Sequence, residues 1–249
     1  MPKPKSVSYV VNTVEDLRNL PKNVNEAVVN GIKYKRYESY DGGTYWAAED
    51  VKIPESVKIY RDVIIGPKVE LSAGIEIGRG STIGKGSKIG KNTVIGEEAH
   101  IGKNSDIGEE VVIGKDVKID NNVTIKEEVI IGPEVELSAG IEIGMQSTIG
   151  WGSKIGPRTT IGERVNIGEN CEIGEEVDIG EGVQIDDDVT IKNGFTIGKR
   201  AHIKERASVE RDVKEGEIVE EGDKVGPEED YDTVEFEDNL IKLRRKQTH

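Results

Sequence analysis

The sequence predicts an all-β fold, a parallel β-solenoid with a triangular cross-section and 18 residues per coil. Aliphatic residues recur at every sixth position from Ile53 to Val209, which makes 27 consecutive anchors. The residue two places before each anchor is aliphatic or small, as in Ile75 and Ser81, and glycine follows most anchors, as in Gly78. Generic β-propensity does not produce such a regular repeat, so the period itself predicts the fold class.

Each hexad corresponds to one short strand and one turn. Because side chains alternate between the two faces of a strand, the anchor and the residue two before it point inward, and the residue between them points outward. We expect the glycine after the anchor to adopt the backbone angles of a tight corner, which a Cβ would disfavour. Three hexads would close one coil, and residues 51–213 would stack about nine coils at about 4.8 Å spacing.

The amino-acid composition and the net charge limit the classes of molecule that this chain is expected to bind. Of the 249 residues, 35% are hydrophobic and 4% aromatic, which is too few for a large globular core. A net charge of −14 disfavours nucleic acid and anionic membranes, because both require a basic surface. No apolar run of about 20 residues and no signal peptide is visible, so a cytoplasmic or virion-associated location is expected. The single Cys171 cannot form an internal disulfide.

The hexad pattern resembles the hexapeptide-repeat left-handed parallel β-helix superfamily, over residues 51 to about 213. This resemblance implies a left-handed coil, an exception to the usual right-handed crossover. Many members of the superfamily are trimeric acyltransferases, and a smaller group are metal-dependent carbonic anhydrases. The resemblance therefore implies a homo-oligomer, with a trimer favoured.

A longer period lies on top of the hexads. Residues 63–128 and 129–194 align without gaps at a shift of 66, and 45 of the 66 positions are identical by direct count. The segment Val69–Gly78 recurs unchanged as 135–144. Such regularity indicates a recent duplication or an engineered, idealised repeat protein. Because 11 hexads is not a multiple of three, corresponding residues are expected on different sides of the prism.

One of the three sides is expected to carry almost no charge. Six successive outward positions on it are uncharged, and three of these are apolar. We predict a self-association surface made of these six residues and two flanking corner residues, namely Val94, Val112, Ile130, Thr148, Asn166, Gln184, Met145 and Trp151. Tolerated surface valines, or a face that binds a ligand, remain as alternatives.

Both ends depart from the repeat and are expected to cover the terminal coils. In residues 1–50 we predict an α+β cap, with a capping box at Thr13 to Asp16, a short helix through Leu20 and a hairpin at Asn30-Gly31. In residues 214–249 we predict a capping strand, a closing hairpin (234–236 with 240–243) and a tail.

Aromatic residues cluster in the N-terminal segment, around Asp41-Gly42-Gly43. Together with the run 14–18, this stretch resembles the opening segment of phage tail-spike proteins, which implies contact with polysaccharide. The aromatic rings could stack on sugars or seal the first coil, and sealing is favoured. The residues concerned are Tyr37, Tyr40, Tyr45 and Trp46.

Catalytic chemistry is sparse in this sequence. Transferases of the superfamily use a histidine as general base, and its carbonic anhydrases need three histidines around a metal. Only His100, His202 and the terminal His249 are present, and the first two are expected on different sides, so they are weak catalytic candidates. No cofactor or metal is predicted. The sequence thus favours a non-catalytic structural or adhesive rod, phage tail-like or engineered, with a hexapeptide-repeat acyltransferase acting at a trimer interface as the alternative.

Overall fold

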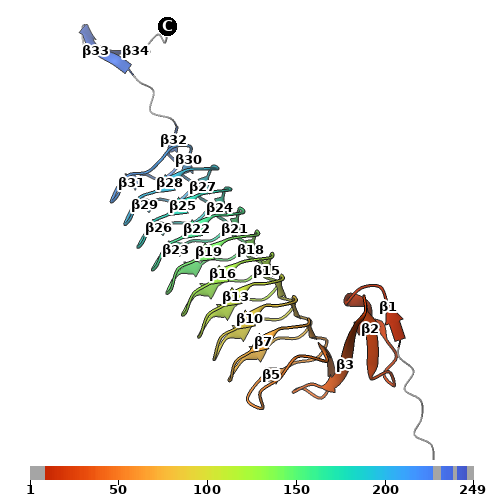
Figure 1. Ribbon diagram of the computed structural model, residues 1–249. Coiled ribbons are helices and arrows are strands. Elements are labelled where there is room, and N and C mark those ends of the chain that lie inside the picture. Colours follow the sequence, from red (N-terminus) through yellow and green to blue (C-terminus); the bar gives the residue numbers. More distant parts are fainter. Residues whose placement is uncertain (1–8, 227–230, 238–239, 246–249) are drawn as a thin grey trace, which may run out of the picture.

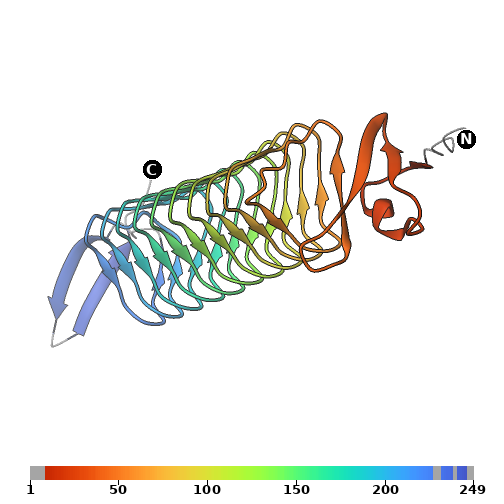
Figure 2. The ribbon, with the colours of Figure 1, turned by 90° about the horizontal axis from the view of Figure 1, so that it is seen from below.

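In the computed structural model the chain is a long parallel β-solenoid with a small β-rich cap at its N-terminal end (Figure 1). The structure describes residues 9–226, 231–237 and 240–245. Viewed from below, the coils stack as a regular prism with the N-terminal cap at one end (Figure 2). The all-β solenoid predicted from the hexads is therefore confirmed.

The three sides of the prism are three parallel sheets, of which the first also includes the cap. The 14-stranded sheet contains β1 (Tyr9–Val11), β2 (Glu26–Val29), β3 (Ile32–Glu38), β4 (Thr44–Ala48), β6 (Ile64–Ile65), β9 (Thr82–Ile83), β12 (His100–Ile101), β15 (Lys118–Ile119), β18 (Glu136–Leu137), β21 (Lys154–Ile155), β24 (Glu172–Ile173), β27 (Thr190–Ile191), β30 (Ser208–Val209) and β32 (Lys224–Val225).

The 8-stranded sheet contains β7 (Glu70–Leu71), β10 (Lys88–Ile89), β13 (Asp106–Ile107), β16 (Thr124–Ile125), β19 (Glu142–Ile143), β22 (Thr160–Ile161), β25 (Asp178–Ile179) and β28 (Thr196–Ile197). The 10-stranded sheet contains β5 (Lys58–Ile59), β8 (Glu76–Ile77), β11 (Val94–Ile95), β14 (Val112–Ile113), β17 (Ile130–Ile131), β20 (Thr148–Ile149), β23 (Asn166–Ile167), β26 (Gln184–Ile185), β29 (His202–Ile203) and β31 (Ile218–Val219). Separately, β33 (Tyr231–Glu237) pairs antiparallel with β34 (Leu240–Arg245), which is the predicted C-terminal hairpin.

Strands of successive coils pair so that each residue of the repeat lies beside the residue 18 positions earlier. Val94 lies beside Val112, and Val112 beside Ile130. The Val94 backbone N–H donates to the Val111 carbonyl at 2.9 Å, and the same bond repeats from coil to coil. The anchors and the residues two before them form one continuous buried core along the axis. Because each coil pairs with its neighbours, backbone groups are satisfied although every strand of the repeat is only two residues long.

The solenoid is longer than the nine coils that the hexads predicted. From β4 to β32 the 14-stranded sheet has eleven strands (14 minus β1, β2 and β3). At the start, Ala47 takes the anchor position and pairs with Ile65. At the end, Val213 bridges Ile197 although it follows Val209 by only four residues. A small anchor and a shortened step hid these coils from a search for strict six-residue spacing.

The glycine after the anchor is required for a different structural reason from the one predicted. The left-handed backbone conformation occurs two residues later, as at Gly80 with φ +72° and Glu98 with φ 53°. Gly78 has no positive φ; instead, a Cβ there would lie 2.5 Å from the Gly96 carbonyl carbon of the next coil. This glycine is thus required for close stacking of coils, and the dihedral requirement belongs to the second corner residue.

Replacing Gly78 with alanine is expected to destabilise the chain by about 1–3 kcal/mol, because the neighbouring backbone must shift to accept the methyl group. Thermal unfolding followed by circular dichroism would measure the loss. Gly226 offers a matched control, since it follows an anchor in the same way but a Cβ there meets no atom within 4 Å. An equal effect at both sites would contradict the stacking argument.

Small hydroxyl residues at the inward position link successive coils. Ser81 donates from Oγ to the Gly96 carbonyl at 2.8 Å and accepts the Ala99 backbone N–H at 3.1 Å. Ser147 makes the equivalent contacts in the second copy, with Gly162 and Val165. Each buried hydroxyl is therefore satisfied, and the polar positions of the core stabilise the stack.

The N-terminal cap has its own small core. The predicted capping box is present, because the Thr13 N–H donates to Asp16 Oδ2 at 2.9 Å and the Asp16 N–H donates to Thr13 Oγ1 at 3.3 Å. The helix that follows is a short 3₁₀ helix, η1 (Glu15–Asn19). Asn30 and Gly31 both have positive φ and join β2 to β3 as the predicted hairpin. No helix among the described residues has the length and apolar character needed to cross a membrane.

Candidate functional site

The outward residues of the 10-stranded sheet form one straight column. Val94, Val112, Ile130, Thr148, Asn166 and Gln184 follow one another at adjacent rungs, and we call them the uncharged column. The three aliphatic side chains are 40%, 41% and 49% exposed. The structure therefore brings the predicted interface residues together on one side of the prism, and their use as an interface stays a prediction.

Exposed apolar side chains gather on or beside this column. Met145 and Trp151 are exposed at the corners on either side of the Thr148 rung. Ile218 is 56% exposed and pairs with His202, so it extends the same side past Gln184. The sequence missed Ile218 because the six-residue spacing breaks between Val209 and Val213. A patch of this kind is typical of an interaction surface.

His202 lies at the end of the uncharged column, between Gln184 and Ile218. Its Nε2 is 2.9 Å from both carboxylate oxygens of Asp186. Asp186 follows the anchor of β26 and approaches His202 as a diagonal neighbour on the adjacent coil. A histidine whose ring is oriented by a carboxylate, at the end of an uncharged column, has the arrangement of a general base.

His100 lies on a different sheet, as predicted. It is exposed between Thr82 and Lys118 on the 14-stranded sheet, and its neighbours include no carboxylate at hydrogen-bond distance among the described residues. The two histidines thus differ in their surroundings, and only His202 is oriented by an acid. The sequence could not identify this difference, because Asp186 is one of three successive aspartates.

Two of the four aromatic residues considered for glycan binding are buried. Trp46 is 2% and Tyr45 7% exposed, and Trp46 packs in the cap core under the Arg36 guanidinium, 4.6 Å from the ring centroid. These two rings are not accessible for stacking on a sugar, because Tyr45 packs in the solenoid core and Trp46 in the cap core. Tyr37 stacks on Tyr45 at 5.4 Å, and Tyr40 remains exposed.

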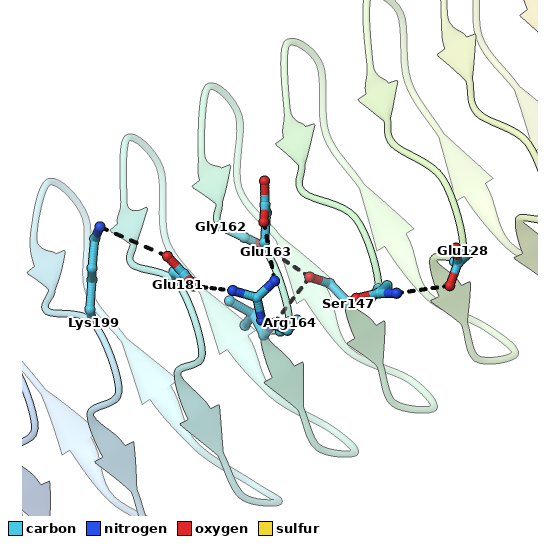
Figure 3. Close-up of polar contacts among 9 residues, drawn as sticks. Glu128, Ser147, Gly162, Glu163, Arg164, Glu181 and Lys199 are labelled. Atoms are coloured by element: carbon cyan, nitrogen blue, oxygen red, sulfur yellow. Dashed lines mark hydrogen bonds and ion pairs between the residues drawn. The ribbon is translucent and has the colours of Figure 1, made fainter.

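The corners of the prism carry ladders of opposite charge. Figure 3 shows Arg164 between Glu163 and Glu181, with Lys199 on the far side of Glu181. These side chains are about half exposed, and such pairs contribute little stability each. Within the described part of the chain no group of three potential metal ligands comes together. The corner acids that contact basic residues are solvated members of ion pairs.

Cys171 is buried at an inward position, and its Sγ donates to the Asp186 carbonyl at 3.1 Å. Burial raises the pKa of the thiol to about 11 from an ordinary value of 9.0. At pH 8 the native thiolate fraction is then about a hundredfold lower than in the unfolded chain, so alkylation should be correspondingly slow. Mass spectrometry after iodoacetamide treatment, with and without urea, measures this difference; equal rates would contradict it.

Comparison with protein families places the repeat among hexapeptide proteins. The model described as GMPPB C-terminal domain matches residues 43–138 and 89–164, and the hexapeptide repeat of succinyl-transferase matches residues 158–199. No curated protein matches the sequence at a significant level.

Solved structures share the fold. The UDP-N-acetylglucosamine acyltransferase from Campylobacter jejuni has a TM-score of 0.60 at 21% identity, over 61% of this chain and 67% of that chain. LpxA from Acinetobacter baumannii has a TM-score of 0.50 at 18% identity, over 70% of this chain and 66% of that chain. The match thus spans about two thirds of each of these structures, and at such identities it establishes the fold.

These matches correct the functional interpretation of the sequence. The prediction of a non-catalytic structural or adhesive rod is wrong, because the family model of a succinyl-transferase repeat and the solved acyltransferases favour the alternative, an acyltransferase. Nothing among them supports the tail-spike resemblance or an engineered origin.

Proposed function

Because the chain belongs to the hexapeptide-repeat left-handed parallel β-helix superfamily, we propose that it is an acyltransferase that acts as a homotrimer. In this proposal the uncharged column faces a second copy of the chain, and His202 is the general base. The substrates are an acyl thioester and an acceptor with a hydroxyl or amino group, such as the UDP-N-acetylglucosamine after which the Campylobacter enzyme is named.

The observation that carries the proposal is the pair of His202 and Asp186. With its proton on Nε2, the imidazole donates to the carboxylate, and Nδ1 presents a lone pair. Nδ1 would take the proton from the acceptor hydroxyl while the hydroxyl oxygen attacks the carbonyl carbon of the thioester. The C–S bond then breaks, and the imidazolium returns the proton to the leaving thiolate. Asp186 accepts the Nε2 proton's hydrogen bond and so fixes the tautomer and orientation of the ring.

A second copy is needed because one prism offers flat sides. Among the described residues no loop interrupts the hexads of the 10-stranded sheet near His202, so a single chain provides no deep cleft there. The neighbouring residues Gln184 and Ile218 are exposed, polar on one flank and apolar on the other. A partner packed on this side would provide the opposite wall of the site and exclude water from it.

Calorimetry with acetyl-coenzyme A tests the proposal directly. We expect saturable binding by the full chain with about one site per subunit interface, and release of free thiol when an acceptor is added. UDP-N-acetylglucosamine and a panel of amino sugars would serve as acceptors, and desulfo-coenzyme A as the unreactive control. Absence of both binding and thioester turnover across the panel would contradict an acyltransferase.

A further inference from the structure

A pocket of about 360 Å³ lies between the N-terminal cap and the first coils of the 14-stranded sheet. This volume falls within the range of about 300–1,000 Å³ typical of small-molecule sites. One wall comes from the cap, at residues 12–14 and the β2–β3 hairpin, and the other from β6, β9 and the corners that follow them. Its lining combines aliphatic side chains with a tyrosine and two lysines, among them Val14, Val29, Ile32, Tyr34, Ile64, Lys85 and Lys103.

The interior of the pocket is apolar. Val29 and Ile64 are at most 2% exposed and belong to the cap core, against which Val14 and Ile32 pack. Two other hollows of the described chain are bordered by charged side chains, one by Glu136, Lys154 and Glu172 on the 14-stranded sheet and one by Glu26, Lys33 and Glu49 in the cap. The pocket between cap and solenoid differs from them in its mostly apolar lining.

Tyr34 contributes a polar group to this apolar interior. The residue is 2% exposed, and its hydroxyl has no hydrogen-bond partner among the described residues. Burial raises the pKa of Tyr34 to about 12, so the hydroxyl stays protonated and can donate. The hydroxyl is not among the buried polar atoms that lack a partner, so it is accessible from the pocket, where a bound acceptor could take its hydrogen bond.

Two lysines at the edge of the pocket add positive charge. Lys85 and Lys103 follow Gly84 and Gly102 at successive coils, so they project from the same corner. Neither ammonium group has an ion-pair partner within the part of the chain that the structure describes, although acids are abundant on this molecule of net charge −14. Most other corner cations, such as Arg164 and Arg206, do contact carboxylates.

We propose that this pocket binds a small amphipathic anion, with its apolar body against Val14, Ile32 and Ile64 and its acidic group between Lys85, Lys103 and the Tyr34 hydroxyl. The acidic group is a carboxylate or a phosphate, which share acceptor oxygens and negative charge. The site is separate from His202, which lies near the other end of the solenoid, so this proposal does not rest on the acyltransferase activity.

Calorimetry on the full chain with octanoate, octyl phosphate and octanol tests the proposal. We expect saturable binding of at least one anion and binding of octanol that is weaker by about tenfold or more, because charge-assisted hydrogen bonds are lost. Replacing Lys85 and Lys103 together with alanine should weaken the preferred anion by about tenfold, and Tyr34→Phe should weaken it severalfold. The order of octanoate and octyl phosphate identifies the acidic group.

The double variant Lys126→Ala and Lys192→Ala is the matched control. Both lysines are exposed, follow an anchor and have no ion-pair partner among the described residues, but they do not line the pocket. Unchanged affinity in this control supports the proposal. It is overturned if neither anion binds saturably, or if removing Lys85 and Lys103 leaves the affinity of a circular-dichroism-verified folded protein unchanged.

Discussion

Replacing His202 with alanine is expected to lower kcat/KM for acyl transfer by about 10²- to 10⁴-fold, because the acceptor hydroxyl loses its general base. His202 is an outward residue of a two-residue strand and makes no contribution to the core, so the fold should survive. Affinity for the acyl thioester should change little, since the imidazole acts on the acceptor proton. Release of free thiol from acetyl-coenzyme A measures the rate, and calorimetry measures the binding.

Two further variants distinguish the loss of a catalytic group from a general loss of structure. Asp186→Asn keeps the shape of the side chain but removes the carboxylate that accepts the Nε2 proton and fixes the tautomer of His202, so kcat should fall. His100→Ala changes an exposed histidine on another sheet and should leave activity unchanged. If His202→Ala and Asp186→Asn both retain full activity, the assignment of the general base is wrong.

Replacing Val112 with lysine is expected to dissociate the proposed trimer into monomers. Val112 lies between Val94 and Ile130 in the uncharged column, and on the trimer axis three buried ammonium groups would be brought together. Burial of unpaired like charges costs several kcal/mol per interface. The isolated chain tolerates lysine on an exposed strand position, so circular dichroism should be unchanged. Sedimentation velocity reports the mass.

Thr124→Lys provides the control, because it adds the same charge to an outward rung of the 8-stranded sheet, between Asp106 and Glu142. This variant should remain trimeric, since two carboxylates neighbour the new ammonium group. A wild-type chain that sediments as a monomer, or a Val112→Lys trimer of unchanged stability, would contradict the assignment of the uncharged column as the interface.

The fold was predictable because the repeat is local and redundant. Each hexad specifies one strand and one corner through the spacing of two inward residues, and 27 hexads repeat the same information. The number of coils was predicted wrongly because the spacing is not strict at either end. Ala47 is a small residue at an anchor position, and Val213 follows Val209 after four residues. A search for strict spacing ends there, although backbone pairing continues through β32.

The candidate site was only partly predictable. Outward positions could be sorted by side, so the uncharged column and the separation of His100 from His202 follow from arithmetic alone. The contact of His202 with Asp186 could not be derived in this way. It depends on the rotamers of two side chains on adjacent coils, and Asp187 and Asp188 were equally plausible partners from the sequence. The exposed position of Ile218 required the actual register of the last coils.

The sequence by itself determined the solenoid, its 18-residue coil and the side that lacks charge, because alternation within a strand and a fixed period leave no freedom in which residues share a face. Only the tertiary structure decided which corner glycines are needed for stacking, where the rings of Tyr45 and Trp46 lie, and which histidine meets a carboxylate. These features depend on distances between coils and between cap and solenoid, and contacts across such gaps have no periodic signature in the chain.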